Sequence, residues 1–196
     1  MDIIHESAHN FIKLEKTKYH FVFVQNRKSH DIILDFKISD FRHATGLHHI
    51  TDIVIENNPI KLVETICKNS PTISDSKLNE SKKYKEEAPF TGSIKQRIAD
   101  MRFLEKCLDS SDFMRIYQVQ HFGSFINADY FIESFCEDIE ANIYIFIRKR
   151  DESDNYVVVS YFRKRISFRG ISTYWLLKEK ISDGEITELY KKSGSE

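Results

Sequence analysis

The second half of the chain shows the two-residue alternation of apolar and polar positions that is typical of β-strands. No helical pattern interrupts these runs, so we expect a largely antiparallel, meander-like sheet and no parallel β-α-β units. Five runs rich in β-branched and aromatic residues, separated by short polar turns, carry this pattern: MRIYQVQ, ADYFIESF, ANIYIFIR, NYVVVSYFR and ISTYWLLK.

The first half mostly shows the 3.6-residue period of helices. Asp2 can cap a first helix, and Asn58 followed by Pro59 is a typical helix start, because proline lacks only an N–H that has no partner there. Ser93 with Gln96 forms a capping box before a further helix. The pattern therefore predicts an α+β fold in which N-terminal helices pack on the antiparallel sheet.

One hairpin interrupts these helices. Residues 19–25 and 31–38 alternate as strands, and the polar link at 26–30 suits a five-residue loop. Residues 69–91 are rich in Ser, Lys and Glu and have few apolar anchors, which predicts a polar flexible insertion. We expect a single domain over residues 1–196 with this insertion inside it.

The composition sets limits on the function. The 196 residues are 41% hydrophobic and carry a net charge of −1, so any binding of RNA or of an acidic lipid surface must come from a local patch. The three cysteines form no CxxC pair, and no apolar run is long enough to cross a bilayer. The sequence predicts a cytoplasmic protein with no membrane association.

Charge is concentrated near the end of the sheet. Residues 148–180 contain nine basic and four acidic residues, an excess of five positive charges. Such a patch could bind phosphate, arginine through paired hydrogen bonds and lysine as a point charge. A charged edge hairpin that only keeps the sheet soluble is the alternative interpretation.

A histidine-rich segment could carry acid–base chemistry. His43 lies in DFRHATGLHHI and is followed by Thr45, His48 and His49, so an imidazole could act as base or acid near neutral pH. Surface histidines without function are the alternative. This segment lacks the HExxH spacing and an acidic residue at a helical offset, so we assign no metal ligand.

Ser160 is a polar position inside the apolar run YVVVSYFRK, where its hydroxyl needs a hydrogen-bond partner. No GxSxG elbow surrounds it, which excludes a serine-hydrolase nucleophile of that type. The chain also lacks the Walker A and GxGxxG loops, so we expect no nucleotide cofactor, and no other cofactor is indicated.

The segment DFKISDFRHATGLHHI, with its Phe-x-His-x-Thr-Gly-Leu pattern, resembles a phage-associated domain of the barnase–EndoU–colicin–RelE nuclease superfamily. The order of the later segments is similar too, and the resemblance covers residues from about 19 to 181. It implies helices packed on an antiparallel sheet and a toxin-like, metal-independent ribonuclease activity. Those later segments are SIKQRIADMRFLEKCLD, FINADYFIES, NIYIFIRK, VVVSYFRK and YWLLKEKI.

The resemblance also implies roles for individual residues. In that superfamily the ribose 2′-OH attacks the adjacent phosphate, which needs a base, an acid and cations near the phosphorane. The matched positions are His43 as base or acid, and Ser160 with Arg163. Thr45, His48, His49, Arg148 and Lys164 would bind substrate, and the second proton-transfer group is left open among His48, His49 and Glu133.

Three functions stay open at this stage. The first is an RNA-cleaving domain of phage or mobile-element origin that acts in conflict between replicon and host, with RNA as substrate. The second is a non-catalytic module that binds RNA or an acidic protein on the same fold. The third is a phage accessory protein that interacts with another protein through its aromatic sheet. The sequence indicates neither an oligomeric state nor whether an inhibitory partner exists.

Overall fold

The computed structural model describes residues 2–68, 71–110, 113–118 and 126–193. Its helical segments are α1 (Ile3–Lys13), η1 (Leu14–Lys16), η2 (Ile38–Asp40), α2 (Phe41–Ala44), η3 (Leu47–His49), α3 (Pro59–Ile66), α4 (Asp75–Leu78), α5 (Lys82–Lys85), α6 (Ile94–Asp100), η4 (Met101–Phe103), α7 (Leu104–Asp109) and η5 (Glu137–Ile139). Its strands are β1 (Thr17–Gln25), β2 (Lys28–Asp35), β3 (Phe113–Tyr117), β4 (Tyr130–Cys136), β5 (Ala141–Lys149), β6 (Tyr156–Arg163), β7 (Gly170–Ser172), β8 (Tyr174–Ser182) and β9 (Glu185–Lys191).

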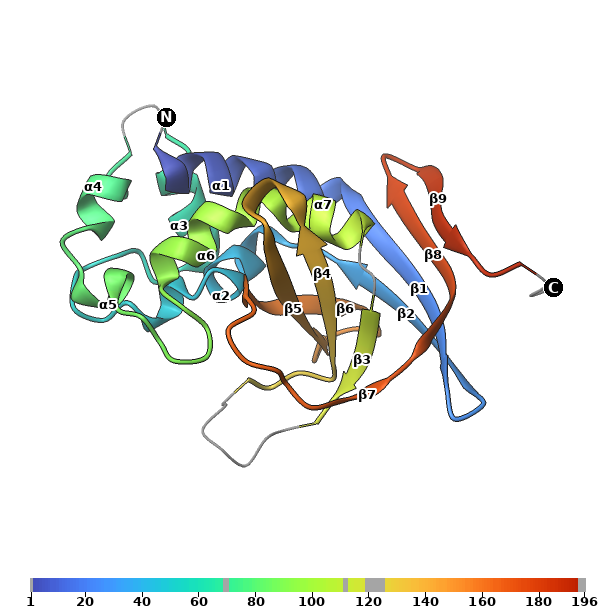
Figure 1. Ribbon diagram of the computed structural model, residues 1–196. Helices are drawn as coiled ribbons and strands as arrows, with labels where there is room; N and C mark the ends of the chain where they lie inside the picture. The colour runs from blue at the N-terminus through green and yellow to red at the C-terminus, as the bar shows by residue number, and fades with distance from the viewer. Residues whose placement is uncertain (1, 69–70, 111–112, 119–125, 194–196) are drawn as a thin grey trace.

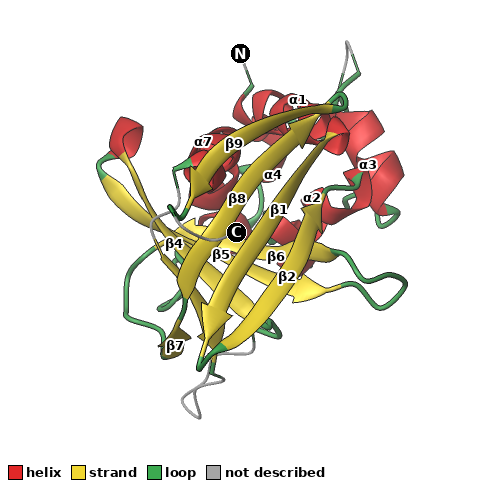
Figure 2. Ribbon diagram, turned by 90° about the vertical axis from the view of Figure 1, so that its right-hand side faces the viewer, coloured by secondary structure: helices red, strands yellow, loops and turns green. Residues whose placement is uncertain are grey.

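The strands of the described residues form one curled sheet in the order β7-β3-β4-β5-β6-β2-β1-β8-β9. Every neighbouring pair is antiparallel except β2 and β6, which are parallel and meet in a single bridge between Leu34 and Tyr156. The longer helices gather at one side of the sheet, as Figures 1 and 2 show. The α+β class and the largely antiparallel sheet are therefore confirmed.

The predicted meander is correct for β3 to β6 but wrong at its end. The run ISTYWLLK is divided between two strands, because β7 pairs with β3 whereas β8 crosses the molecule to pair with β1. Thr173 marks the crossing point, where its backbone N–H and its hydroxyl both donate to the Met114 carbonyl. Residues 119–120, the end of the run MRIYQVQ, lie outside the described residues.

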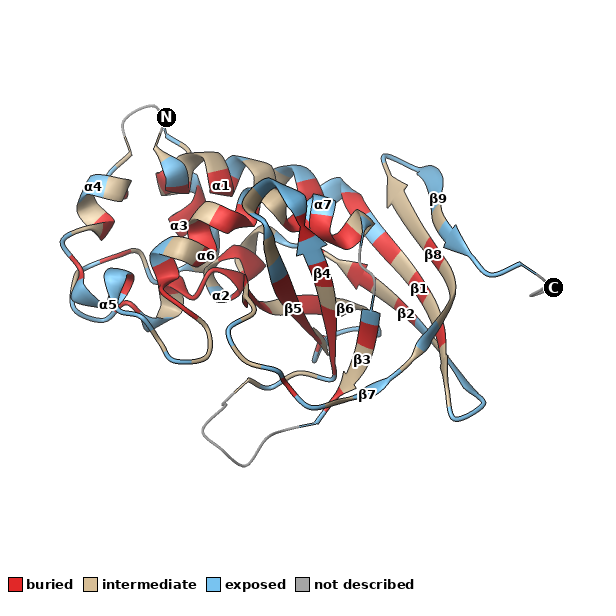
Figure 3. Ribbon diagram, in the orientation of Figure 1, coloured by how far each residue is buried: buried red, intermediate tan, exposed pale blue. Residues whose placement is uncertain are grey.

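Two apolar clusters lie on opposite faces of the sheet. The larger one fills the space between the helices and the sheet, where Phe11 of α1 packs edge-on against Phe41. Figure 3 shows buried residues concentrated there. The smaller one lies on the far face of β4 to β6 and contains Phe131, Phe146 and Phe162. The strand β6 is therefore covered on both faces, which explains its nearly continuous apolar sequence.

The first hairpin has a shorter turn than the sequence predicts. Strand β2 begins at Lys28, so only Asn26 and Arg27 connect the strands, and the five-residue loop is wrong. Both turn residues take positive φ angles, 49° and 64°. Two consecutive left-handed residues form the tight turn whose twist matches that of the flanking strands.

The helix starts are partly as expected. The Asn58 side chain caps α3 by accepting the backbone N–H groups of Ile60 and Lys61, and Ser93 caps α6. Asp2 does not cap α1. Instead the Asp75 carboxylate accepts the N–H groups at the start of α1, while the Asp2 carboxylate accepts the N–H of Asp75.

The polar segment at 69–91 contains regular structure within the described residues. It forms α4 and α5, whose Leu78 and Tyr84 side chains are buried. The Asp52 carboxylate accepts the Ser81 hydroxyl and the first N–H of α5. The flexibility expected of this segment stays a prediction. In the part of the chain that the structure describes, none of the helices combines the length and apolarity needed to span a membrane.

Candidate active site

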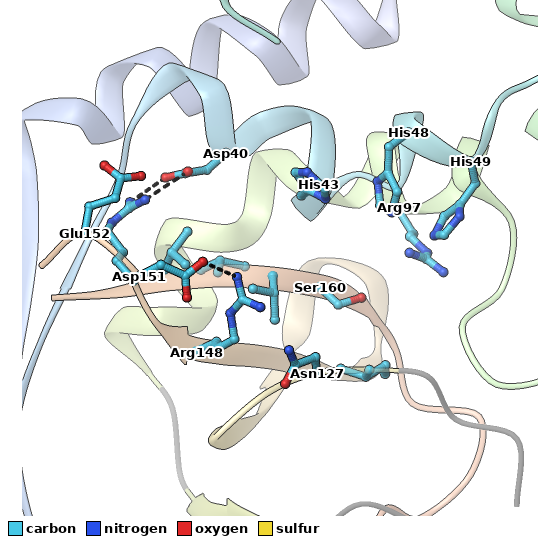
Figure 4. Close-up of a pocket in the computed structure, with 15 residues that line it drawn as sticks. Asp40, His43, His48, His49, Arg97, Asn127, Arg148, Asp151, Glu152 and Ser160 are labelled. Carbon is cyan, nitrogen blue, oxygen red and sulfur yellow. Dashed lines mark hydrogen bonds and ion pairs between the residues drawn. The ribbon is translucent and has the colours of Figure 1, made fainter. Parts of the chain in front are cut away.

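A cleft of about 380 Å³ lies next to the place where β2 and β6 separate after their single bridge. The helical segments α2 and η3 form one wall, and the facing ends of β5 and β6 form the other (Figure 4). Five of the eight predicted site residues line it together, namely His43, His48, His49, Arg148 and Ser160. The tertiary structure therefore brings together residues that are more than 100 positions apart in the sequence.

The three histidines form a row along the upper wall. The ring centroids of His43 and His48 are 4.4 Å apart, and those of His48 and His49 are 3.8 Å apart. Gly46 separates α2 from η3 with a φ of +82°, a left-handed angle that glycine adopts readily at a helix end. A Cβ atom at Gly46 would also lie 3.0 Å from an Arg97 side-chain nitrogen, so any larger residue would push against the Arg97 guanidinium.

His48 has the most strongly shifted titration of the three. Burial, assisted by the neighbouring His49, lowers its pKa to about 4, so the ring is neutral at pH 7. Its Nδ1 atom lies 3.3 Å from the Arg42 carbonyl oxygen, which can only accept a hydrogen bond. The neutral ring must therefore carry its proton on Nδ1, and Nε2 keeps a free lone pair.

His43 and His49 are also neutral at pH 7. Loss of hydration lowers the pKa of His43, and the nearby Arg42 and Arg148 lower it further. Loss of hydration likewise lowers the pKa of His49, with Arg97 adding to the effect. All three imidazoles are thus available as proton acceptors or as neutral hydrogen-bonding groups.

Arg97 of α6 is the functional candidate that the sequence did not reveal. Its side chain is buried beside His48 and His49 (Figure 4), and burial lowers its pKa to about 10. The Nε–H donates to the Thr91 carbonyl, and the guanidinium lies 5.5 Å from the centre of the Phe162 ring. No carboxylate within the described residues comes within ion-pair distance of it. A buried cation without a counter-ion is poised to bind an anion.

The sequence contains a signal for Arg97 in its spacing. The residue lies three positions after Ile94 and four before Met101, so it belongs to the buried stripe of this helix. A charged residue in an apolar stripe is unusual, because its burial is costly without a partner.

Ser160 and Arg148 lie on the opposite wall. Phe146 pairs with Ser160 and Ile147 with Val158, so Val159 is an extra residue in β6. Such a bulge changes which way the next side chains face, and here it lies beside the cleft. Within the described residues, Arg148 has one ion-pair partner, Asp151, at 3.7 Å. That carboxylate is 87% exposed, so the pair is weak and leaves Arg148 available to a ligand.

The remaining predicted residues have other partners. Arg163 binds the buried Asp100 carboxylate through two nitrogens, at 2.6 and 2.8 Å. Lys164 binds Glu133 at 2.5 Å, and neither residue lines the cleft. The Thr45 hydroxyl is buried and donates to the Phe41 carbonyl. The catalytic role of Arg163 and the substrate-binding roles of Thr45 and Lys164 stay predictions, and these contacts do not favour them.

Ion pairs neutralise most of the basic block at 148–180. Seven of its nine basic residues pair with carboxylates in the described part of the chain. Arg150, for example, binds both Asp35 and Asp40. Of the basic block that was expected to bind phosphate, Arg148 is therefore the residue that remains available inside the cleft. Arg97, which lies outside this block, is the second cation there.

A second cleft of about 320 Å³ adjoins the first and shares His49 and Arg97 with it. The loop from Ala88 to Gly92 forms its far side and is closed by two backbone hydrogen bonds between these residues. Among the described residues, no group of three or more His, Cys, Asp or Glu side chains could hold a metal ion.

One family of known proteins matches almost the whole chain. The model of the family described as phage-Barnase-EndoU-ColicinE5/D-RelE like nuclease4 matches residues 3–195. The chain belongs to this family of phage nuclease-like domains. The resemblance first seen in the Phe-x-His-x-Thr-Gly-Leu segment is therefore confirmed over almost the whole chain. No curated protein and no solved structure is similar enough to count as a match.

Proposed function

We propose that this nuclease-like protein is an endoribonuclease that cleaves RNA without a metal ion, through attack of a ribose 2′-OH on the adjacent phosphate. The observation that carries the proposal is Arg97, a buried cation beside three histidines, for which the described residues provide no carboxylate counter-ion. A phosphodiester would supply the missing negative charge. The histidines would supply the proton transfers that the reaction needs.

Each cleft residue has a role in this proposal. His48 takes the proton of the 2′-OH through its free Nε2 as the new bond between the 2′-oxygen and phosphorus forms. Protonated His43 gives its proton to the 5′-oxygen as the bond between that oxygen and phosphorus breaks. Arg97 and Arg148 bind the non-bridging oxygens from opposite walls, and the Ser160 hydroxyl donates to one of them.

The adjoining second cleft gives the substrate room to continue. It shares Arg97 with the first cleft, so a nucleotide next to the bound phosphate could occupy it. Non-catalytic RNA binding is the main alternative on this fold. The neutralised basic block disfavours it, because sequence-independent RNA binding relies on unpaired Lys and Arg side chains.

RNA cleavage by the purified full-length chain tests the proposal. In the presence of EDTA we expect products that end in 2′,3′-cyclic phosphate, and a loss of activity in His43→Ala of about 10²-fold or more. Lys61→Ala, an exposed substitution on α3, should leave the activity unchanged. Intact RNA after long incubation between pH 5 and 8 would sink the proposal. Salt-dependent RNA retention that is insensitive to His43→Ala would support the binding module instead.

The pH dependence of kcat/KM is a second expectation. The base must be deprotonated, so kcat/KM should increase as the pH rises through the His48 pKa of about 4. The acid must be protonated, so kcat/KM should decrease as the pH rises further through the His43 pKa, which lies below its ordinary value of 6.5. A short fluorogenic RNA at constant ionic strength should therefore give a bell-shaped profile with an acidic optimum between these values. A rate that keeps rising to pH 8 would contradict these assignments.

A further inference from the structure

Helix α1 carries two histidines, His5 and His9, more than 30 residues before the histidines of the cleft. Residues 5–9 read HESAH, so the HExxH spacing that is missing from residues 43–49 is present here. On a helix this spacing places both imidazoles on one face, one turn apart. His5 is half-buried and His9 is exposed, on the side of α1 that points away from Ile4, Ala8 and Phe11.

The two rings face each other through a hydrogen bond between their Nε2 atoms, which a shared cation would replace. Their Nε2 atoms are 3.2 Å apart and their ring centroids 4.4 Å. An imidazole nitrogen binds zinc at about 2.0–2.1 Å, so two such nitrogens around one ion are about 2.9 Å apart in octahedral and about 3.4 Å apart in tetrahedral geometry. The observed separation lies between these values. A cation could therefore enter without a change of helix geometry.

The surrounding contacts hold this arrangement in place. The Asp75 carboxylate accepts the N–H groups of Ile3 and Ile4, which fixes the first turn of α1. The Ser7 hydroxyl donates to the Ile98 carbonyl and ties the next turn to α6. Because the helix is anchored at both points, binding of a cation would require little ordering of the protein.

We propose that His5 and His9 chelate one divalent transition-metal ion of the zinc, nickel and copper class through their Nε2 atoms. Water would complete the coordination, because the described residues supply no third protein ligand. Imidazole pairs suit these ions and do not suit magnesium or calcium, which prefer oxygen ligands.

The site does not form a metalloprotease centre, although its sequence matches that motif. A hydrolytic zinc site keeps three protein ligands and uses the motif glutamate as general base. Here the Glu6 carboxylate lies 3.7 Å from the Arg102 guanidinium, which gives it another partner. The ion would thus bind at the surface of α1, and binding would stabilise the folded chain.

Titration of the untagged full-length protein with ZnCl₂ and NiCl₂, followed by calorimetry and by the unfolding temperature, tests the proposal. We expect one bound ion per chain and a higher unfolding temperature, whereas MgCl₂ should have no effect. His9→Gln should weaken binding at least about tenfold. The histidine row in the cleft is the competing location for the ion, and His48→Gln tests it. This variant should leave metal binding intact.

Two outcomes would overturn the proposal. In one, His9→Gln binds the ion as well as the unchanged chain does, or neither zinc nor nickel binds at all. In the other, His48→Gln abolishes binding, which would place the ion in the cleft. His9 is exposed, so its replacement should not disturb the fold, and an unchanged unfolding temperature of the metal-free variant would verify this.

Discussion

Arg97→Met is expected to remove RNA cleavage while leaving the folded chain as stable as before, or more stable. The guanidinium is buried and has no carboxylate partner among the described residues, so folding bears its desolvation cost. Replacement of a buried charge by an apolar side chain of similar length is often neutral or stabilising. The same change deletes the cation proposed to bind the phosphorane, and we expect a loss of about 10²–10³-fold in kcat/KM.

The matched control is Lys95→Met on the same helix, where the side chain is exposed and has no place in the cleft. It should change neither RNA cleavage nor thermal stability. Both variants can be followed by cleavage of a short RNA and by the unfolding temperature. If Arg97→Met unfolds more easily and cleaves RNA at the normal rate, the residue is structural and the proposed phosphate site is wrong.

Arg150→Ala is expected to have the largest effect on stability. This arginine is buried and binds Asp35 at the end of β2 and Asp40 before α2, while its own backbone follows β5. Its removal leaves two largely buried carboxylates without a counter-ion. Loss of one partner from a buried ion pair costs about 3–5 kcal/mol, so we expect a decrease of this size in the free energy of unfolding.

Urea denaturation measures this decrease, and the neighbouring Lys149→Ala provides the comparison. Lys149 pairs with Asp154, whose side chain is 98% exposed, so its loss should change stability by less than about 1 kcal/mol. A similar small change in both variants would contradict a structural role for the Arg150 pairs. Asp40 also lines the cleft, so a destabilised Arg150→Ala should lose RNA cleavage as well.

The local sequence determined most of the elements. Strands and helices follow from the period of apolar residues, and the caps at Asn58 and Ser93 follow from side chains that accept nearby N–H groups. These are interactions between residues a few positions apart. Where the true partner was distant, local prediction failed, as at Asp75, which caps α1 from more than 70 residues away.

The candidate site also divides into features that follow from local sequence and features that depend on contacts between distant residues. The histidines and Ser160 could be named from the sequence because polar groups stand out in apolar or motif-bearing segments. Only the tertiary structure decided which of the basic residues are available. Arg163 and Lys164 are paired with Asp100 and Glu133, contacts that no sequence spacing reveals.

The sequence by itself determined an α+β fold, the four-strand part of the predicted meander and five of the polar residues that line the cleft. The tertiary structure decided where β8 pairs, where the cleft opens beside β2 and β6, and that Arg97 lines it with no carboxylate partner in the described part of the chain. The physical reason is that apolar periodicity is a property of a single segment. The availability of a charge depends on every carboxylate that folding brings near it, and none of the residues that the structure describes forms an ion pair with Arg97.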